Sequence, residues 1–276
     1  MADGVRIFSY LPNPRVWKST IAGRLCGVPV EVRGAKPDQL KEWLWDFDAR
    51  PLTEVNPEAL DGLARTSRRG FANSVLYKTE QFLQANPYGT VPAAFSADGA
   101  IGVFESNSIM RLVARLGGDG SGLWGAGPFE ASRIDSFLDA ALGFGHDTQR
   151  YLLSLIGGKL DSHVHAAALQ AAHTYLAGIE RTLSRGAQVL VGSGISLADI
   201  CFACEIALLT SEQRSADLLR DQGLAPVLSG ALWAEYPNAL AHFHRLIGHP
   251  AFEPDLSAYA SRYATMVSDN RHPETP

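Results

Sequence analysis

The first part of the chain alternates between short apolar runs and longer stretches in which apolar residues recur at helical spacing. Residues 5–10 (VRIFSY) predict a strand, and the spacing over residues 15–25 predicts a helix. Asn13 followed by Pro14 marks the start of that helix, because asparagine accepts from free backbone N–H groups and proline at the first helical position loses no hydrogen bond. Residues 28–32 predict a second strand, so the chain opens as strand, helix, strand.

Residues 34–76 show no regular spacing. The segment contains three prolines and an aromatic group made of Trp43, Trp45 and Phe47. Because so many aromatic side chains are unusual in a disordered chain, we predict an ordered insertion or a long loop. This aromatic group could lie over a ligand-binding site of the protein or take part in a dimer interface. The sequence does not decide between these two positions.

The pattern becomes regular again after the insertion. It predicts a helix, two strands joined by a turn at Asp98–Gly99, and a further helix, at residues 79–83, 91–95, 101–104 and 106–116. Added to the opening unit, these elements make a compact α/β domain of the thioredoxin type. We therefore predict such a domain over residues 1–116, with the insertion inside it.

Strand signals disappear in the second half of the chain. Residues 117–128 are rich in glycine and predict an interdomain linker. Beyond it, apolar residues recur at helical spacing over residues 129–156, 163–185, 197–214 and 239–247. We therefore predict that residues 129–276 form an all-helical domain.

Composition narrows the class of protein. The 276 residues are 46% hydrophobic and carry a net charge of -5, without a long basic run, which disfavours binding to nucleic acid or to an anionic membrane. No apolar stretch approaches the roughly 20 residues that span a bilayer, and the N-terminus lacks a signal-peptide layout. The three cysteines suggest a reducing compartment, so a cytoplasmic protein is expected.

Two short segments could bind an extended peptide. Thr90-Val91-Pro92 enters a predicted strand, and a cis bond before Pro92 would turn the backbone N–H and C=O of Val91 outward to pair with such a peptide. An ordinary edge strand with a trans proline is the alternative. Glu105 and Ser106 lie where a strand ends and a helix begins, with Ser106 as the expected N-cap.

The pair Glu105 and Ser106 suits a ligand with two opposite charges. A helix N-terminus with free N–H groups and a hydroxyl binds a carboxylate, and the carboxylate of Glu105 beside it could take an ammonium group. Together they would fit an amino-acid head group. A plain helix cap with an acidic neighbour is the alternative.

Four motifs in a fixed order carry a resemblance to a known family. They are Asn86–Pro92 (NPYGTVP), Phe104–Ile109 (FESNSI), Leu190–Gly192 (LVG) and Ser196–Asp199 (SLAD). In this order, and with the predicted elements around them, they resemble the glutathione transferase superfamily over nearly the whole chain outside the insertion. Within it, FESNSI, residues 13–18 and residues 236–238 look most like the transferase-like domain of the elongation factor gamma subunit and its bacterial relatives.

The resemblance implies a role for each matching position. Glu105 and Ser106 would hold the γ-glutamyl end of glutathione, and Val91, before Pro92, would pair its backbone with the cysteinyl unit. Thr90 would assist there, and Lys78 would contact the glycyl carboxylate. Arg15 adds a cation near the start of the first helix. Ser196 and Asp199 form a capping box whose role is stability.

The group that activates the thiol is not fixed by the resemblance. Many members place Ser or Cys five residues before a basic residue in the first helix, and here that position, counted from Lys18, holds Asn13. Ser9 and Tyr10, at the end of the first strand, are the other hydroxyl donors. Each of the three could stabilise a thiolate, and each has a purely structural alternative.

Three polar residues in the second half are candidate substrate-pocket groups: His146, Gln149 and Arg150, on a helix that lines the electrophile pocket in this family. Cys201 and Cys204 form a C-x-x-C inside a predicted helix among apolar residues, which favours small core residues over a redox pair. The histidines lack partners at ligand spacing, so we expect no metal.

The resemblance thus implies a glutathione transferase-type enzyme with glutathione as co-substrate. Its substrate would be a small hydrophobic, aromatic electrophile, and the reaction conjugation or glutathione-dependent ether cleavage by a β-etherase, serving detoxification or aromatic compound catabolism. A homodimer is implied as well. The alternative is a non-catalytic binding or scaffold module of the same fold.

Overall fold

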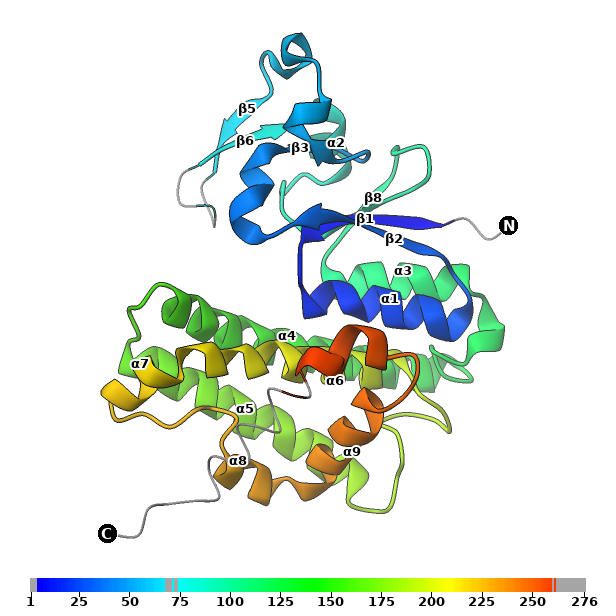
Figure 1. The fold of residues 1–276 in the computed structure, drawn as a ribbon. Coiled ribbons are helices and arrows are strands. Elements are labelled where there is room, and N and C mark those ends of the chain that lie inside the picture. Colours follow the sequence, from blue (N-terminus) through cyan, green and yellow to red (C-terminus); the bar gives the residue numbers. More distant parts are fainter. Residues whose placement is uncertain (1–3, 68–70, 72–73, 260, 262–276) are drawn as a thin grey trace. The chain divides into compact units, whose positions relative to one another are not determined.

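A computed structural model describes residues 4–67, 71, 74–259 and 261. The chain divides into two compact units, unit 1 over residues 1–121 and unit 2 over residues 122–276 (Figure 1). Each unit has its own architecture. Among the described helices, none is long and apolar enough to cross a lipid bilayer.

Unit 1 contains a four-stranded mixed sheet in the order β2-β1-β7-β8. Strand β1 runs parallel to β2 and antiparallel to β7, and β7 is antiparallel to β8. The four strands are Val5–Tyr10, Val30–Ala35, Ala93–Phe95 and Gly102–Phe104 for β1, β2, β7 and β8. Helices α1 (Pro14–Cys26) and α3 (Ser106–Leu116) pack against each other beside this sheet (Figure 1). The thioredoxin-like arrangement predicted for the first domain is confirmed.

The ends of α1 follow directly from the sequence. Asn13 is the N-cap, and its side-chain oxygen accepts a hydrogen bond from the backbone N–H of Arg15. Gly27 ends the helix at φ 75°, a left-handed conformation that costs glycine little because it has no Cβ. Both signals lie within a few residues of the helix they delimit, so the prediction located the helix well.

The prediction that residues 34–76 are irregular is wrong. Four short strands from this segment and its end form a second sheet in the order β4-β3-β6-β5, namely Arg50–Pro51, Trp43–Trp45, Val75–Lys78 and Ala64–Thr66. A short 3₁₀ turn at Pro37–Glu42 precedes these strands, and two more, Leu52–Glu54 and Pro57–Leu60, lie between them in the chain. Strands of two to four residues are too short to show a recognisable alternation, and for that reason the pattern missed them.

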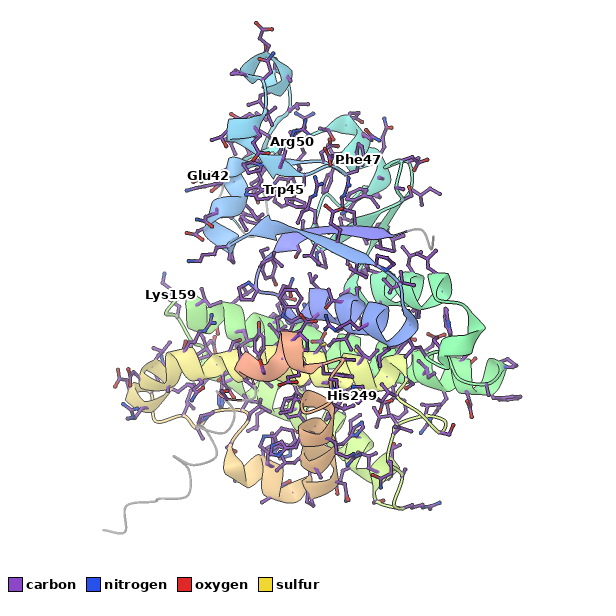
Figure 2. The ribbon with its side chains drawn as sticks, turned by 45° about the vertical axis from the view of Figure 1, so that its right-hand side comes forward. Glu42, Trp45, Phe47, Arg50, Lys159 and His249 are labelled. Atoms are coloured by element: carbon purple, nitrogen blue, oxygen red, sulfur yellow. The ribbon has the colours of Figure 1, made fainter. Side chains whose placement is uncertain are left out.

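Trp45 explains why this segment is ordered. Its side chain is 1% exposed and packs edge-on against Phe8 of β1, Phe71, and Phe82 of α2 (Glu80–Ala85). Its indole N–H donates to the carbonyl of Leu40, which satisfies the polar atom of a buried ring. Figure 2 labels Trp45 among the side chains of unit 1. Trp45 is therefore a core residue of unit 1, and neither position left open by the sequence applies to it.

In the part of unit 2 that the structure describes, the regular elements are helices joined by loops. Its long helices are α4 (Pro128–Ile156), α5 (Ser162–Leu183), α6 (Leu197–Leu209) and α9 (Pro237–Ile247), close to the predicted ranges. A 3₁₀ turn (Thr210–Ser215) replaces the predicted end of α6, and α7 (Ala216–Asp221) and α8 (Gly230–Glu235) were not predicted. A further 3₁₀ turn, Asp119–Ser121, ends unit 1.

Helix α6 is buried on nearly every side. Cys201 and Cys204 lie within it at 1% and 0% exposure, which agrees with the prediction that they are small core residues. A reactive thiol needs access and an electropositive setting, and neither cysteine has access to solvent here.

Asp199 holds the start of α6 in place. Its carboxylate accepts from the backbone N–H of Ser196 at 2.8 Å and from that of Leu190 at 2.9 Å, so the predicted capping box is confirmed. The same carboxylate, which is fully buried, lies 2.8 Å from Nε2 of His242 on α9, and Nδ1 of that ring accepts from Arg245 at 2.9 Å. One side chain therefore links the start of α6, the loop before it and α9.

Glu212 has a similar role on the other side of unit 2. Its fully buried carboxylate accepts from the hydroxyl of Tyr151 on α4 and from the backbone N–H groups of Val227 and Leu228, each at 2.8 Å. Burial raises the pKa of Glu212 from its ordinary value of 4.5 to about 7. The three hydrogen bonds act in the opposite direction, because they favour the charged form.

Replacing Asp199 by alanine should destabilise unit 2 strongly. The substitution leaves two buried backbone N–H groups and His242 without their acceptor, and breaking such a buried network costs about 3–5 kcal/mol. Chemical denaturation followed by circular dichroism measures this loss. The matched control is Asp217→Ala, because Asp217 is an exposed acidic residue in the first turn of α7 that pairs with Arg220. Equal stabilities of the two variants would contradict the role given to Asp199.

Stability should also depend on pH through Glu212. Between about pH 4.5 and 7 the folded state holds the Glu212 proton more tightly than the unfolded state does. The free energy of unfolding should therefore fall as pH rises through this range, by at most about 1.4 kcal/mol per pH unit from this group. Denaturation at several pH values measures the slope, and Glu212→Gln, which cannot titrate, should remove this component. An unchanged slope in that variant would contradict the assignment.

Candidate functional site

The register of the sheet brings three predicted segments to one edge of unit 1. Phe8 pairs with Ala93, and Ala93 pairs with Phe104. Because both pairings are antiparallel, the residues after Phe8, those before Ala93 and those after Phe104 leave the sheet on the same side. Ser9–Tyr10, Val91–Pro92 and Glu105–Ser106 therefore gather at this edge, although they are separated widely in the sequence.

Ser9 and Asn13 are buried at this edge and are hydrogen-bonded to each other. Both side chains are 0% exposed, and the amide nitrogen of Asn13 donates to the hydroxyl of Ser9 at 3.2 Å. The oxygen of the same amide caps α1 through the N–H of Arg15 at 3.0 Å. Asn13 thus has the structural role that was its alternative in the sequence analysis, and a role for either residue at a sulfur atom stays a prediction.

Tyr10 and Arg15 differ from that pair because both are partly exposed. Tyr10 ends β1 and packs at the border of the aromatic cluster around Trp45. Arg15 lies in the first turn of α1. Of the three residues predicted for thiol activation, Tyr10 is the one with surface that a ligand could reach.

Lys78 ends β6 and reaches the loop before Pro92. Its ammonium donates to the carbonyl of Gly89 at 2.6 Å and lies 4.5 Å from the centre of the Trp45 ring. Burial lowers the pKa of Lys78 below its ordinary value. The lysine therefore fastens the second sheet to the loop that carries Thr90 and Val91.

Two side-chain contacts hold the loop from Asn86 to Pro92, one inside the loop and one to β8. The side-chain amide of Asn86 donates to the carbonyl of Thr90 at 2.7 Å, and the ring of Tyr88 meets Phe104 at 5.2 Å between centroids. The Val91–Pro92 bond is cis, which was one of the two predicted alternatives. Thr90 is exposed and Val91 is partly exposed, so both are open to solvent beside Glu105.

Glu105, and not Ser106, is the N-cap of α3, so the predicted cap position is wrong by one residue. Glu105 has φ 67° and ψ 122°, its side chain makes no capping hydrogen bond, and its carbonyl accepts from the N–H of Ile109 at 3.0 Å. A positive φ of this kind is strained for any residue with a Cβ, and residues with such strained backbone are frequent at ligand-binding sites. Glu105 is also exposed, so its carboxylate is available to a ligand.

Lys18 was not predicted to take part in binding, yet it lies directly behind Ser106. It is 1% exposed, and its ammonium donates to the side-chain oxygen of Asn107 at 2.8 Å and lies 3.5 Å from the hydroxyl of Ser106. This buried cation adds to the positive potential of the α3 N-terminus. The sequence held one signal for it, a lysine on the otherwise apolar face of α1 that packs on α3.

The resulting site presents opposite charges side by side. The N-terminus of α3, backed by Lys18, suits a carboxylate, and the exposed carboxylate of Glu105 suits an ammonium group. Open backbone at Val91 follows along the same edge. This is the pattern expected for an amino-acid head group continued by a short peptide.

The three pocket residues predicted in unit 2 lie on α4, and all are exposed. Nδ1 of His146 is 3.1 Å from the carboxylate of Asp147, and Gln149 and Arg150 follow on the same side of the helix. Whether they meet a substrate stays a prediction. Within the described residues, no group of three His, Cys, Asp or Glu side chains could hold a metal ion.

Comparison with known proteins points to one superfamily. No protein-family model matches the chain. Elongation factor 1-gamma 1 of rice is 28% identical over 192 residues, which cover 69% of this chain and 41% of that protein. A glutathione S-transferase-like protein of Aspergillus aculeatus is 26% identical over 163 residues, covering 56% of this chain and 74% of the relative. The chain thus spans about 41% of the length of its elongation factor relatives.

Solved structures agree with the fold. Poplar glutathione transferase F1 matches with a TM-score of 0.62 at 17% identity, over 94% of this chain and 100% of that chain. A glutathione S-transferase of Methylobacillus flagellatus, solved with glutathione bound, matches with a TM-score of 0.58 at 16% identity, over 91% and 98%.

The fold is therefore that of the glutathione transferases, a mixed-sheet first domain followed by a helical region. In sequence the chain is related to elongation factor 1-gamma and to a glutathione transferase-like protein, so the resemblance predicted from the four motifs is confirmed.

Glu105→Gly and Glu105→Ala separate backbone strain from the side chain. Both variants remove the carboxylate, but only glycine adopts φ 67° without a Cβ clash, so Glu105→Gly should be more stable than Glu105→Ala by about 1 kcal/mol. Thermal unfolding of the two variants under one condition measures the difference. A lower melting temperature for Glu105→Gly would show that this backbone is not strained.

Proposed function

We propose that unit 1 binds glutathione at the edge formed by Val91–Pro92 and Glu105–Ser106. The observation that carries this proposal is the strained, exposed Glu105 at the start of α3, beside Ser106 and in front of the buried ammonium of Lys18. The γ-glutamyl group has an ammonium and a carboxylate on one carbon. Its ammonium would pair with Glu105, and its carboxylate would bind at the α3 N-terminus.

The rest of the tripeptide would follow the loop. The backbone of Val91 would pair with the cysteinyl unit, and Thr90 would add a hydroxyl beside it. Lys78 would meet the glycyl carboxylate, which would compete with the carbonyl of Gly89 for its ammonium. Arg15 would add a positive charge near the start of α1.

The chemistry that follows binding would be that of a transferase-type enzyme. Glutathione, as co-substrate, would attack a small hydrophobic, aromatic electrophile, in a conjugation or a glutathione-dependent ether cleavage. His146, Gln149 and Arg150 would contribute to the electrophile pocket. Because Ser9 and Asn13 are fully buried and bonded to each other, Tyr10 is the donor best placed to stabilise the thiolate.

A non-catalytic binding module is the second candidate. Two observations favour it. The side chains of Ser9 and Asn13 are buried and hydrogen-bonded to each other, and the chain is related in sequence to elongation factor 1-gamma. Such a module would keep the fold and bind a protein partner. A cytoplasmic location and a homodimer belong to the first candidate and remain proposals with it.

Isothermal titration calorimetry with glutathione tests the binding site. Glu105→Ala and Ser106→Ala should each weaken binding, by about tenfold or more for Glu105 because a charge-assisted hydrogen bond is lost. Glu80→Ala is the matched control, since Glu80 is an exposed acidic residue in the first turn of α2. Wild-type protein without measurable affinity for glutathione would overturn the proposal.

Kinetics then separate the two candidate functions. The enzyme hypothesis predicts conjugation of glutathione to chlorodinitrobenzene or a related aryl electrophile, and a rate at least about tenfold lower for Tyr10→Phe at unchanged glutathione affinity. The ultraviolet absorbance of the thiolate against pH gives the pKa of the bound thiol. Tight binding with an unshifted thiol pKa and no turnover would favour the non-catalytic module.

A further inference from the structure

Lys18 on α1 is a buried cation directly behind the proposed glutathione site. Its side chain is 1% exposed, and its ammonium donates to the side-chain oxygen of Asn107 at 2.8 Å. The same ammonium lies 3.5 Å from the hydroxyl oxygen of Ser106, the first residue of α3. Because water screens a buried charge poorly, Lys18 acts strongly on a ligand at the start of α3.

The ammonium of Lys18 also orients the hydroxyl of Ser106. An ammonium group has donors and no acceptor, so the oxygen of Ser106 faces it as an acceptor and the hydroxyl hydrogen turns away. Ser106 is partly exposed, so this hydrogen is available to a ligand. A carboxylate at the start of α3 would therefore meet an oriented O–H donor in addition to the backbone N–H groups of the helix.

Glu105 can bind an ammonium group without giving up a contact within the protein. Its side chain is exposed and makes no capping hydrogen bond. Pairing with the ammonium of a γ-glutamyl group would displace only water from its carboxylate. Both charged groups of the γ-glutamyl end would thus form new charge-assisted hydrogen bonds, which are the strong ones.

Lys78, at the glycyl end of the site, already has partners. Its ammonium donates to the carbonyl of Gly89 at 2.6 Å and lies 4.5 Å from the centre of the Trp45 ring. A Cβ atom added at Gly89 would lie 3.2 Å from this ammonium, so the lysine is packed against the loop. A glycyl carboxylate would have to share or replace the bond to Gly89, and an exchanged hydrogen bond contributes little net free energy.

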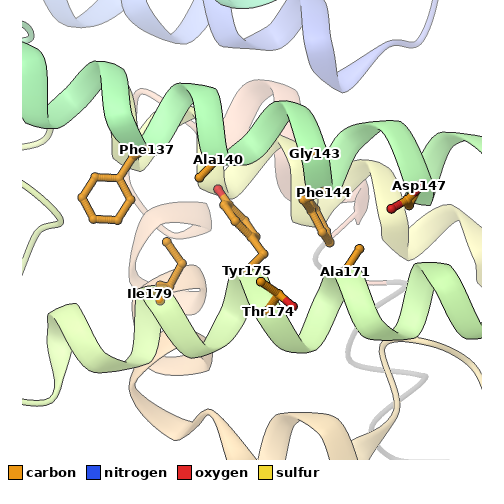
Figure 3. Close-up of a pocket in the computed structure, with 10 residues that line it drawn as sticks. Phe137, Ala140, Gly143, Phe144, Asp147, Ala171, Thr174, Tyr175 and Ile179 are labelled. Atoms are coloured by element: carbon orange, nitrogen blue, oxygen red, sulfur yellow. The ribbon is translucent and has the colours of Figure 1, made fainter.

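The cavity in unit 2 does not offer a comparable site for an anionic head group. It has a volume of about 350 Å³ and lies between α4 and α5 beside Tyr175 (Figure 3). Glycines on both helices, Gly143 and Gly178, leave this space open. Its described lining residues include no lysine or arginine, and the charged side chain among them is Asp147. The carboxylates of a γ-glutamyl peptide are therefore expected in unit 1.

We propose that the site in unit 1 recognises γ-glutamyl thiols as a class, so that γ-glutamylcysteine binds about as well as glutathione. Lys18 is the positioning residue of this site, because it orients the Ser106 hydroxyl and selects a free carboxylate on the γ-glutamyl group. The contact between Lys78 and a glycyl carboxylate adds little. This inference rests on the proposed glutathione site and names the part of the ligand that the site requires.

Titration calorimetry of the full chain compares glutathione, γ-glutamylcysteine and cysteinylglycine. The affinity for γ-glutamylcysteine should be within about threefold of that for glutathione, because the bond of Lys78 is only exchanged. Cysteinylglycine lacks the γ-glutamyl group and should bind at least about a hundredfold more weakly, because two charge-assisted contacts are lost.

Variants of Lys18 test its role through a ratio of affinities. The two ligands are glutathione and its analogue with a carboxamide in place of the γ-glutamyl carboxylate. Wild-type protein should prefer the free carboxylate by at least about tenfold, and Lys18→Met should reduce this preference to within about threefold. Lys18→Arg should keep the preference, because it keeps the charge. A purely structural role of Lys18 would weaken both ligands equally and leave the ratio unchanged.

Two further variants complete the Lys18 experiment. Lys41→Met is the matched control, because Lys41 is an exposed lysine in the 3₁₀ turn Pro37–Glu42, and it should leave the ratio unchanged. If Lys18→Met does not fold, Lys18→Gln removes the same charge with a polar side chain, and the same ratio is measured.

Lys78→Met separates the two ends of the ligand. It should weaken glutathione and γ-glutamylcysteine by the same factor, because both depend on the loop that Lys78 holds through Gly89. A variant that weakens glutathione alone would show that Lys78 acts mainly on the glycyl carboxylate.

The outcomes distinguish this inference from the proposed function. Glutathione bound at least about tenfold more tightly than γ-glutamylcysteine would overturn the inference and leave the glutathione site in place. An unchanged carboxylate preference in the charge-removing Lys18 variant would overturn the role of Lys18. Wild-type protein that binds neither γ-glutamyl thiol would overturn the proposed function and this inference together.

Discussion

The pairing of β7 with both β1 and β8 is the constraint on which the site in unit 1 depends. Backbone hydrogen bonds fix Ala93 opposite Phe8 on one side and opposite Phe104 on the other. Shifting either pairing by one residue would turn every side chain to the other face of the sheet. The register of the sheet therefore sets the position of Glu105 relative to Val91.

Strain at Glu105 fits this dependence. A residue at φ 67° persists only where its surroundings determine its backbone, and here β8 ends and α3 begins within one residue. The buried ammonium of Lys18, held by Asn107, then adds a positive charge behind a helix start that is already positive. Both features lie where the proposed function places the γ-glutamyl group of glutathione.

The insertion and unit 2 show how buried polar groups organise irregular segments. Trp45 orders strands that are too short to form by themselves, and Lys78 fastens them to the loop of Gly89. In unit 2, Asp199 and Glu212 each tie a helix start or turn to segments distant in the sequence. Such groups are expensive to bury, so each must keep its full set of partners. The buried polar groups fix the positions of the turns and helix starts, and the apolar residues determine which faces of the helices and strands are buried.

The sequence alone determined the elements whose signals are local. Asn13 and Pro14 located the start of α1, Ser196 and Asp199 located the start of α6, and the four motifs indicated the fold. Strands of two or three residues carry no such signal, so the second sheet could not be found. The sequence also could not show that Ser9 and Asn13 bond to each other, that Lys18 lies behind Ser106, or that glycines on α4 and α5 leave a cavity beside Tyr175. These depend on which side chains meet across elements distant in the chain, and only the tertiary structure decides that.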